Sequence, residues 1–217
     1  MADAKHSEIF EHIGRLKVVP VIAIDDADAA EPLADALTAG GLPVAEITFR
    51  TAAGAAAIEK LAQARPDVLV GAGTLLTVDQ LHSARDFGAR FGVSPGLDPR
   101  LVEEALKLGF PFFPGVMTPS DVSAGLAMGL TALKFFPAQA AGGVALLKAL
   151  AGPFAHTGVK FLPTGGVGEA NFLDYLHLPA VLAVGGSWLA KRADIAGGRW
   201  SDITARCRSA VEALATE

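Results

Sequence analysis

Short β-rich runs recur along this chain at a nearly constant spacing, with alanine- and leucine-rich helical stretches between them. Eight such runs begin at Lys17, Val44, Val68, Arg90, Phe110, Thr131, Val159 and Ala180. Successive starts are 27, 24, 22, 20, 21, 28 and 21 residues apart, about the length of one strand, one helix and two short loops. Eight units of this kind predict an α/β fold, a (βα)8 TIM barrel.

A doubly wound open sheet would produce the same alternation of strands and helices, so the spacing alone leaves both architectures open. The count of eight favours the barrel, as does the lack of a Gly-x-Gly-x-x-Gly turn after the first strand. An extra N-terminal helix is predicted over residues 3–15. No linker or low-complexity segment divides the units, so residues 1–217 are predicted to form a single barrel domain.

Composition narrows the classes of partner. The hydrophobic content of 51% fits parallel strands that are buried on both faces. The longest stretch without Asp, Glu, Lys or Arg, residues 175–190, is interrupted by Pro179 and is shorter than the ~20 residues of a membrane helix. A net charge of -5 without clustered basic residues argues against a nucleic-acid surface. Neither a membrane nor a nucleic acid is therefore predicted as a partner.

The cysteine content and the first residues bear on the compartment. Cys207 is the one cysteine, which rules out a disulfide within the chain. The first eight residues lack the charged-then-apolar order of a secretory signal. A cytoplasmic protein is the simplest interpretation.

One lysine lies within an apolar strand-like run: Lys134 in the segment TALKFFP, residues 131–137. Burying an ammonium group is costly, so a lysine in this place is paired, neutral or chemically used. A neutral amine is a good nucleophile. The alternative is a stem packed on the apolar surface with its head in water. Lys160 is the poorer candidate, because it lies four residues before Thr164, toward the floor of the predicted barrel.

The second strand carries an alternating polar face. Glu46, Thr48 and Arg50 share one face of it by two-residue periodicity, and the carboxyl ends of barrel strands are where catalytic groups gather. We therefore expect these side chains to point into the barrel. The alternative is that Glu46 and Arg50 form an ion pair that only plugs the barrel.

Glycine-rich turns follow several other strands. The third, fourth and fifth end in GAGT (71–74), SPG (94–96) and PGVMTP (114–119), small-residue turns that let a ligand approach the backbone. Gly165-Gly166 and Gly185-Gly186 follow the seventh and eighth strands, and Ser187 is placed at the start of a helix. Amide N–H groups and a helix dipole there predict a phosphate site. Two tight turns without a ligand would also explain the glycines.

No metal or organic cofactor is predicted. The five histidines lie outside the proposed strand ends and show no metal-ligand spacing. Cys207 is expected to pack in the last helix rather than to act as a nucleophile.

Seven segments in chain order resemble the class I aldolase family of 2-dehydro-3-deoxy-6-phosphogluconate (KDPG) and 4-hydroxy-2-oxoglutarate (KHG) aldolases. They are EITFRT (46–51), GAGT (71–74), SPG (94–96), PGVMTP (114–119), KFFPA (134–138), PTGG (163–166) and GGSW (185–188). KFFPA and E-x-T-x-R-T are the specific elements, and the resemblance covers nearly the whole chain. It makes Lys134 the favoured nucleophile.

The resemblance implies roles for these residues. Lys134 would form the Schiff base and Glu46 would carry protons. Substrate binding would fall to Arg50, Thr74, Pro95, Phe136 and Thr164, and phosphate binding to Gly165, Gly166, Gly186 and Ser187. Some relatives that act on the galactonate epimer carry an arginine at the end of the first strand, whereas this chain has Ala23-Ile24-Asp25 there, which favours the gluconate series.

The activity implied by the resemblance is a metal-independent lyase of the Entner–Doudoroff pathway and carbohydrate metabolism. It would cleave KDPG reversibly to pyruvate and glyceraldehyde 3-phosphate, and KHG to pyruvate and glyoxylate. Its partner would be a small 2-oxo acid, and the assembly a homotrimer. Two alternatives use the same phosphate site without a covalent lysine: a phosphosugar isomerase or epimerase, and a non-catalytic barrel that binds sugar phosphates.

Overall fold

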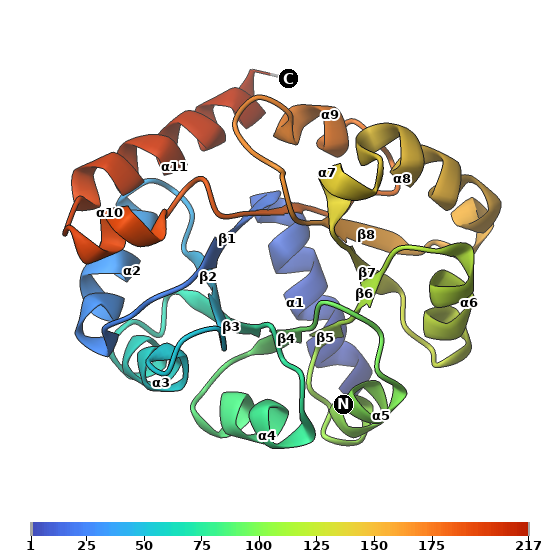
Figure 1. Ribbon diagram of the computed structural model, residues 1–217, viewed down its shortest axis with the longest axis horizontal. Helices are drawn as coiled ribbons and strands as arrows, with labels where there is room; N and C mark the ends of the chain where they lie inside the picture. Colours follow the sequence, from blue (N-terminus) through green and yellow to red (C-terminus); the bar gives the residue numbers. More distant parts are fainter. Residues whose placement is uncertain (1, 217) are drawn as a thin grey trace.

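The computed structural model describes residues 2–216, with side chains described from Glu8 onward. Its strands are all parallel and form one curled sheet in two pieces (Figure 1). The six-stranded piece has the order β5-β4-β3-β2-β1-β9, and its strands are β1 (Val18–Ile22), β2 (Val44–Thr48), β3 (Leu69–Gly73), β4 (Phe91–Val93), β5 (Phe112–Phe113) and β9 (Val184–Gly186). The second piece is β6 (Gly115–Val116), β7 (Ala132–Phe135) and β8 (Lys160–Pro163).

The two pieces approach each other at both of their edges. Pro114 alone separates β5 from β6, and proline has no N–H to donate to a ladder. On the other side, isolated parallel bridges join Phe161 to Val181 and Thr164 to Gly185. The expected start of the eighth run at Ala180 is corrected to Val184, because this segment pairs with β8 only at separate points.

Helices lie around the curled sheet, except for α1 (Ala2–Leu16), which crosses the middle of the view (Figure 1). The α-helices are α1 (Ala2–Leu16), α2 (Ala30–Ala39), α3 (Gly54–Ala64), α4 (Val78–Asp86), α5 (Pro99–Lys107), α6 (Pro119–Ala127), α7 (Ala138–Ala141), α8 (Gly143–Ala151), α9 (Phe172–Leu176), α10 (Arg192–Ala196) and α11 (Trp200–Ala215); two 3-10 helices are η1 (Ala27–Ala29) and η2 (Gly152–Thr157). Side chains cap several amino ends: Thr77 accepts from Gln80 N, and Thr118 with Asp121 forms a capping box before α6. Among the helices described, none combines the length and apolar character required to cross a membrane.

The buried apolar side chains form two clusters. The larger lies between the sheet and the surrounding helices. The smaller occupies the inside of the sheet, near the amino ends of the strands, where Phe10 of α1 contacts Phe113 edge-on at 4.8 Å between ring centroids and Phe91 lies 6.0 Å from Phe113. Because α1 and these rings fill that end, polar groups inside the sheet are confined to the carboxyl ends of the strands.

Candidate active site

A cavity of about 210 Å³ opens at the carboxyl ends of the strands. All eleven residues expected to form the site line it: Glu46, Arg50, Thr74, Pro95, Lys134, Phe136, Thr164, Gly165, Gly166, Gly186 and Ser187. Val21, Thr48, Val167 and Gly185 complete the lining. The sequence pattern placed Thr48 on the inner face without giving it a role, and it gave no signal for Val21 or Val167.

Lys134 is directed into this cavity by the alternation of β7. Its neighbours Leu133 and Phe135 are fully buried against the helices, so Lys134 points to the inside of the sheet. Its side chain is only 6% exposed, and Nζ lies 5.1 Å from the centroid of the Phe136 ring. The head of the lysine therefore does not extend into bulk water, which contradicts the alternative of a stem packed on an apolar surface.

Glu46 faces this amine from β2. Its Oε1 lies 3.5 Å from Lys134 Nζ, and its side chain is 0% exposed. Among the described residues, neither carboxylate oxygen has a hydrogen-bond partner. A buried carboxylate without hydrogen bonds costs free energy, so this arrangement favours a chemical role over a stabilising one.

Gly73 of β3 gives Glu46 its space. A β-carbon built at position 73 would overlap Oε1 of Glu46 and would lie 2.9 Å from its carboxyl carbon. Any side chain at this position would therefore displace the carboxylate. From the sequence, Gly73 was only part of a small-residue turn. The side chain that it makes room for, Glu46, belongs to another strand, so the local pattern gave no sign of this contact.

Arg50 is held by a hydrogen-bonded chain rather than by Glu46. Its Nε donates to Thr48 Oγ1 over 3.1 Å, and the Thr48 hydroxyl donates to the carbonyl of Ile22 over 2.8 Å. The alternative of a Glu46–Arg50 ion pair is wrong for the described residues, since Glu46 faces Lys134 instead. Thr48 thus fixes a guanidinium at the cavity and ties β2 to β1.

Thr74 sits in a backbone conformation that is rare for its residue type. Its φ is +59°, in the left-handed region, which is a genuine outlier for a β-branched residue. Such strain concentrates at functional sites, where the surrounding structure holds it. In this conformation Thr74 lines the same cavity as Arg50.

The glycines that follow β8 and the two glycines at the end of β9 line the same cavity. Gly165 and Gly166 have φ values of +97° and +76°, and Thr164 pairs with Gly185 across the sheet. The expectation that Ser187 begins a helix is wrong: bends follow β9, and α10 begins only at Arg192. A helix dipole therefore does not contribute at Ser187, and an anion there would be bound by the backbone of the glycine turns together with Thr164 and Ser187.

Other candidate groups lie elsewhere. Lys160 is exposed and donates to the carbonyl of Pro179 over 2.8 Å. Burial raises the pKa of the Cys207 thiol to about 12. A thiol that stays protonated is a poor nucleophile, as expected for a cysteine that packs in the core. Among the side chains that the structure describes, residues 8–216, no three His, Cys, Asp or Glu gather in a way that could bind a metal ion.

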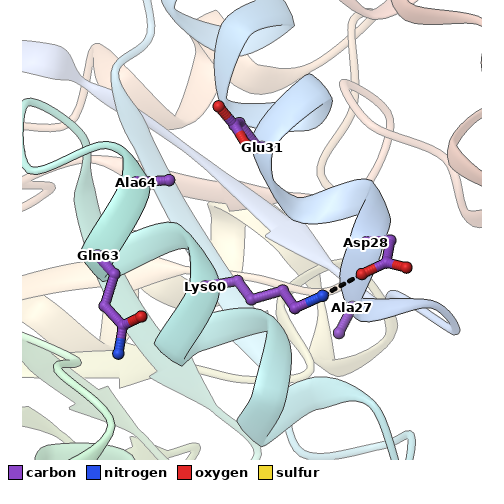
Figure 2. A pocket seen from close by; sticks show the side chains of 6 residues that line it. All are labelled: Ala27, Asp28, Glu31, Lys60, Gln63 and Ala64. Atoms are coloured by element: carbon purple, nitrogen blue, oxygen red, sulfur yellow. Dashed lines mark hydrogen bonds and ion pairs between the residues drawn. The ribbon is translucent and has the colours of Figure 1, made fainter.

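A surface hollow of about 430 Å³ exceeds the site cavity in volume but lacks its chemistry. It lies between η1, the start of α2 and α3, where Lys60 pairs with Asp28 (Figure 2). That lysine is half exposed, whereas Lys134 is enclosed beside a carboxylate. The smaller cavity is therefore the better candidate for catalysis.

A family model and a curated relative both match most of this chain. The family model described as KDPG and KHG aldolase matches residues 9–206. The 2-dehydro-3-deoxy-phosphogluconate aldolase of Haemophilus influenzae is 46% identical over 207 residues, which cover 95% of this chain and 97% of that protein. The resemblance drawn from the sequence motifs is thereby confirmed.

Two solved structures are also similar. A crystal structure of the KDPG aldolase from Legionella pneumophila holds pyruvate captured at low pH as a covalent carbinolamine intermediate; it matches with a TM-score of 0.86 and 46% identity, covering 89% of this chain and 93% of that one. A crystal structure of the 2-keto-3-deoxy-6-phosphogluconate aldolase of Zymomonas mobilis with 3-phosphoglycerate matches with a TM-score of 0.83 and 40% identity. The match covers 92% of this chain and 93% of that one.

Proposed function

This chain belongs to the KDPG and KHG aldolase family, and from that membership we propose that it is a class I aldolase, a metal-independent lyase. It cleaves 2-dehydro-3-deoxy-6-phosphogluconate reversibly to pyruvate and glyceraldehyde 3-phosphate, and 4-hydroxy-2-oxoglutarate to pyruvate and glyoxylate. The observation that carries this proposal is the enclosed pair of Lys134 Nζ and Glu46 Oε1, 3.5 Å apart.

Lys134 acts as the nucleophile. Its neutral amine attacks the ketone carbon of the 2-oxo acid to form a carbinolamine, whose oxygen takes one proton from the amine and a second from solvent through Glu46 and leaves as water. The resulting iminium withdraws electrons from the adjacent carbon–carbon bond. Glu46 takes the proton from the C4 hydroxyl of the substrate as this bond breaks and the aldehyde departs. The enamine of pyruvate that remains is protonated through Glu46 and water, and hydrolysis of the imine frees Lys134.

The remaining residues orient the substrate. Arg50 and Thr74 bind the carboxylate next to the ketone, and Pro95 and Phe136 shape the pocket around it. Thr164 with Gly165, Gly166, Gly186 and Ser187 binds the distal part and its phosphate. Support for this division comes from the cavity, which has the guanidinium of Arg50 and the positive-φ glycines in its lining.

The architecture that we propose is a closed (βα)8 barrel with α1 as an extra N-terminal helix, in one domain over residues 1–217. It is supported by the bridges between β8 and β9 and by the single proline between β5 and β6. A homotrimer, a cytoplasmic location and a place in the Entner–Doudoroff pathway follow from the family resemblance. Exposed Leu76 and Met117, at 55% and 44%, are suited to an interface between copies, and light scattering would measure the mass of the assembly.

Reductive trapping tests the reaction. Borohydride added with pyruvate should inactivate the enzyme and leave a pyruvate adduct that peptide mapping assigns to Lys134. Lys134→Arg should give no adduct and no turnover, because a guanidinium stays protonated at neutral pH. A phosphosugar isomerase or epimerase, or a non-catalytic binding barrel, would form no imine. An active enzyme whose adduct lies on another lysine would overturn the assignment.

A further inference from the structure

The helix that follows the lysine strand is docked on the glycine loop. Two backbone amides of α7 donate to this loop: Ala138 N to the carbonyl of Thr164 over 2.8 Å, and Gln139 N to that of Gly165 over 2.9 Å. Gly166 leaves no room for a side chain, because a β-carbon there would come within 2.5 Å of Gln139 Cβ. The Gln139 side chain therefore lies directly against the loop.

Three side chains extend this contact into a hydrogen-bonded network. Gln139 Oε1 accepts from the Tyr175 hydroxyl over 3.0 Å and from Asn171 Nδ2 over 3.3 Å. Asn171 Nδ2 also donates to the carbonyl of Gly166 over 3.2 Å, while its Oδ1 accepts from Gly168 N over 2.8 Å. The loop 165–168 is thus held at Gly166 and at Gly168 by one amide side chain.

The network is anchored in the core and stays outside the cavity. Tyr175 is 0% exposed, and a buried phenol hydroxyl requires a partner, which here is Gln139. Gln139, Asn171 and Tyr175 are not among the residues that line the site cavity, whereas Gly165, Gly166 and Val167 are. The three side chains can therefore act on substrate only through the loop they hold.

We infer that Gln139, Asn171 and Tyr175 are positioning residues that fix the glycine loop 165–168 and thereby set the preference for 2-oxo acids ending in phosphate over those ending in carboxylate. The inference rests on the proposed function and deepens it. Oriented backbone dipoles bind an anion well only when they are fixed in advance. A six-carbon phosphorylated substrate reaches this loop, while the five-carbon dicarboxylate ends closer to Lys134.

Two variants test the network. Tyr175→Phe removes one hydroxyl and keeps the ring that fills the core, and Asn171→Ala removes the side-chain hydrogen bonds at Gly166 and Gly168. We expect the ratio of kcat/KM for KDPG to that for KHG to fall about threefold to tenfold in Tyr175→Phe, the range that the loss of one or so net hydrogen bonds produces. In Asn171→Ala, which loses more contacts, the fall should be larger. The rate of reductive trapping by pyruvate should stay at the wild-type value in both.

Gln63→Ala is the matched control. This glutamine lies on α3 beside the outer hollow, away from the glycine loop (Figure 2), and its replacement should leave the ratio unchanged. A ratio that stays at the wild-type value in folded Tyr175→Phe and Asn171→Ala, or equal losses for both substrates, would refute the inference while leaving the aldolase intact. A wild-type protein that cleaves neither substrate and traps no pyruvate would instead refute the proposed function, and the inference with it.

Discussion

Lys134 Nζ and Glu46 Oε1 lie 3.5 Å apart although their strands, β7 and β2, are not neighbours in the sheet. β2 pairs with β1 and β3, and β7 pairs with β6 and β8. The contact therefore spans the inside of the curled sheet rather than a ladder (Figure 1). Only the curvature of the sheet brings together an amine and a carboxylate that are 88 residues apart in the chain.

Glu46→Gln should separate imine formation from the proton transfers. The amide keeps the shape of the side chain but cannot accept a proton, so kcat for KDPG cleavage should fall by a factor of roughly 10²–10⁴. Reductive trapping of pyruvate on Lys134 should persist. Steady-state kinetics and mass spectrometry of the reduced adduct measure the two effects, and unaltered turnover would show that another group or water is the base.

Gly73→Ala should impair the enzyme through Glu46 without touching substrate. The new methyl group would occupy the space of Oε1, so the carboxylate must move away from Lys134, and small misplacements of catalytic groups cost about 10²-fold in rate. Gly152→Ala is the matched control, because a β-carbon at position 152 meets no atom within 4 Å. Equal kcat/KM values in the two variants would contradict the role of Gly73.

Periodicity and motif spacing were sufficient to predict the inner face of β2 and the turns around the cavity. Two-residue alternation placed Glu46, Thr48 and Arg50 together because a strand fixes side-chain direction by parity alone. Their partners could not be predicted in this way. That Glu46 faces Lys134 rather than Arg50 depends on the curvature of the sheet, which no local pattern encodes.

The same limit explains the corrections. A serine after paired glycines is compatible with a helix start, yet bends intervene between Ser187 and α10. The network of Gln139, Asn171 and Tyr175 joins segments 32 and 36 residues apart, and each residue alone is ordinary for its position. Such contacts depend on how one strand–helix unit packs against the next, so the sequence of either unit alone does not reveal them.

Thr48→Val should weaken the binding of the 2-oxo acid. Valine has nearly the same shape but no hydroxyl, so Arg50 loses the acceptor 3.1 Å from its Nε and the Ile22 carbonyl loses its donor. We expect KM for KDPG and for KHG to rise alike, by about threefold to tenfold, the effect of one or so net hydrogen bonds. Thr48→Ser keeps the hydroxyl and should retain most of the affinity. If Thr48→Val left both KM values unchanged, or if Thr48→Ser raised them as much as Thr48→Val, the two hydrogen bonds of the hydroxyl would not account for the affinity.

Cys207 should be inert to thiol reagents in the folded enzyme. Burial raises the pKa of its thiol to about 12, and only the thiolate reacts. At about pH 8 the thiolate fraction is then roughly a thousandfold below that of a free cysteine, whose pKa is near 8.5. Raising the pH increases this fraction tenfold per unit until the pKa is reached, so labelling of the native protein should accelerate with pH while remaining slow. Absorbance with a disulfide reagent measures the rate, with the protein in denaturant as the control. Labelling of the native protein as fast as the denatured one would show that the last helix, α11, does not hold Cys207 in the core.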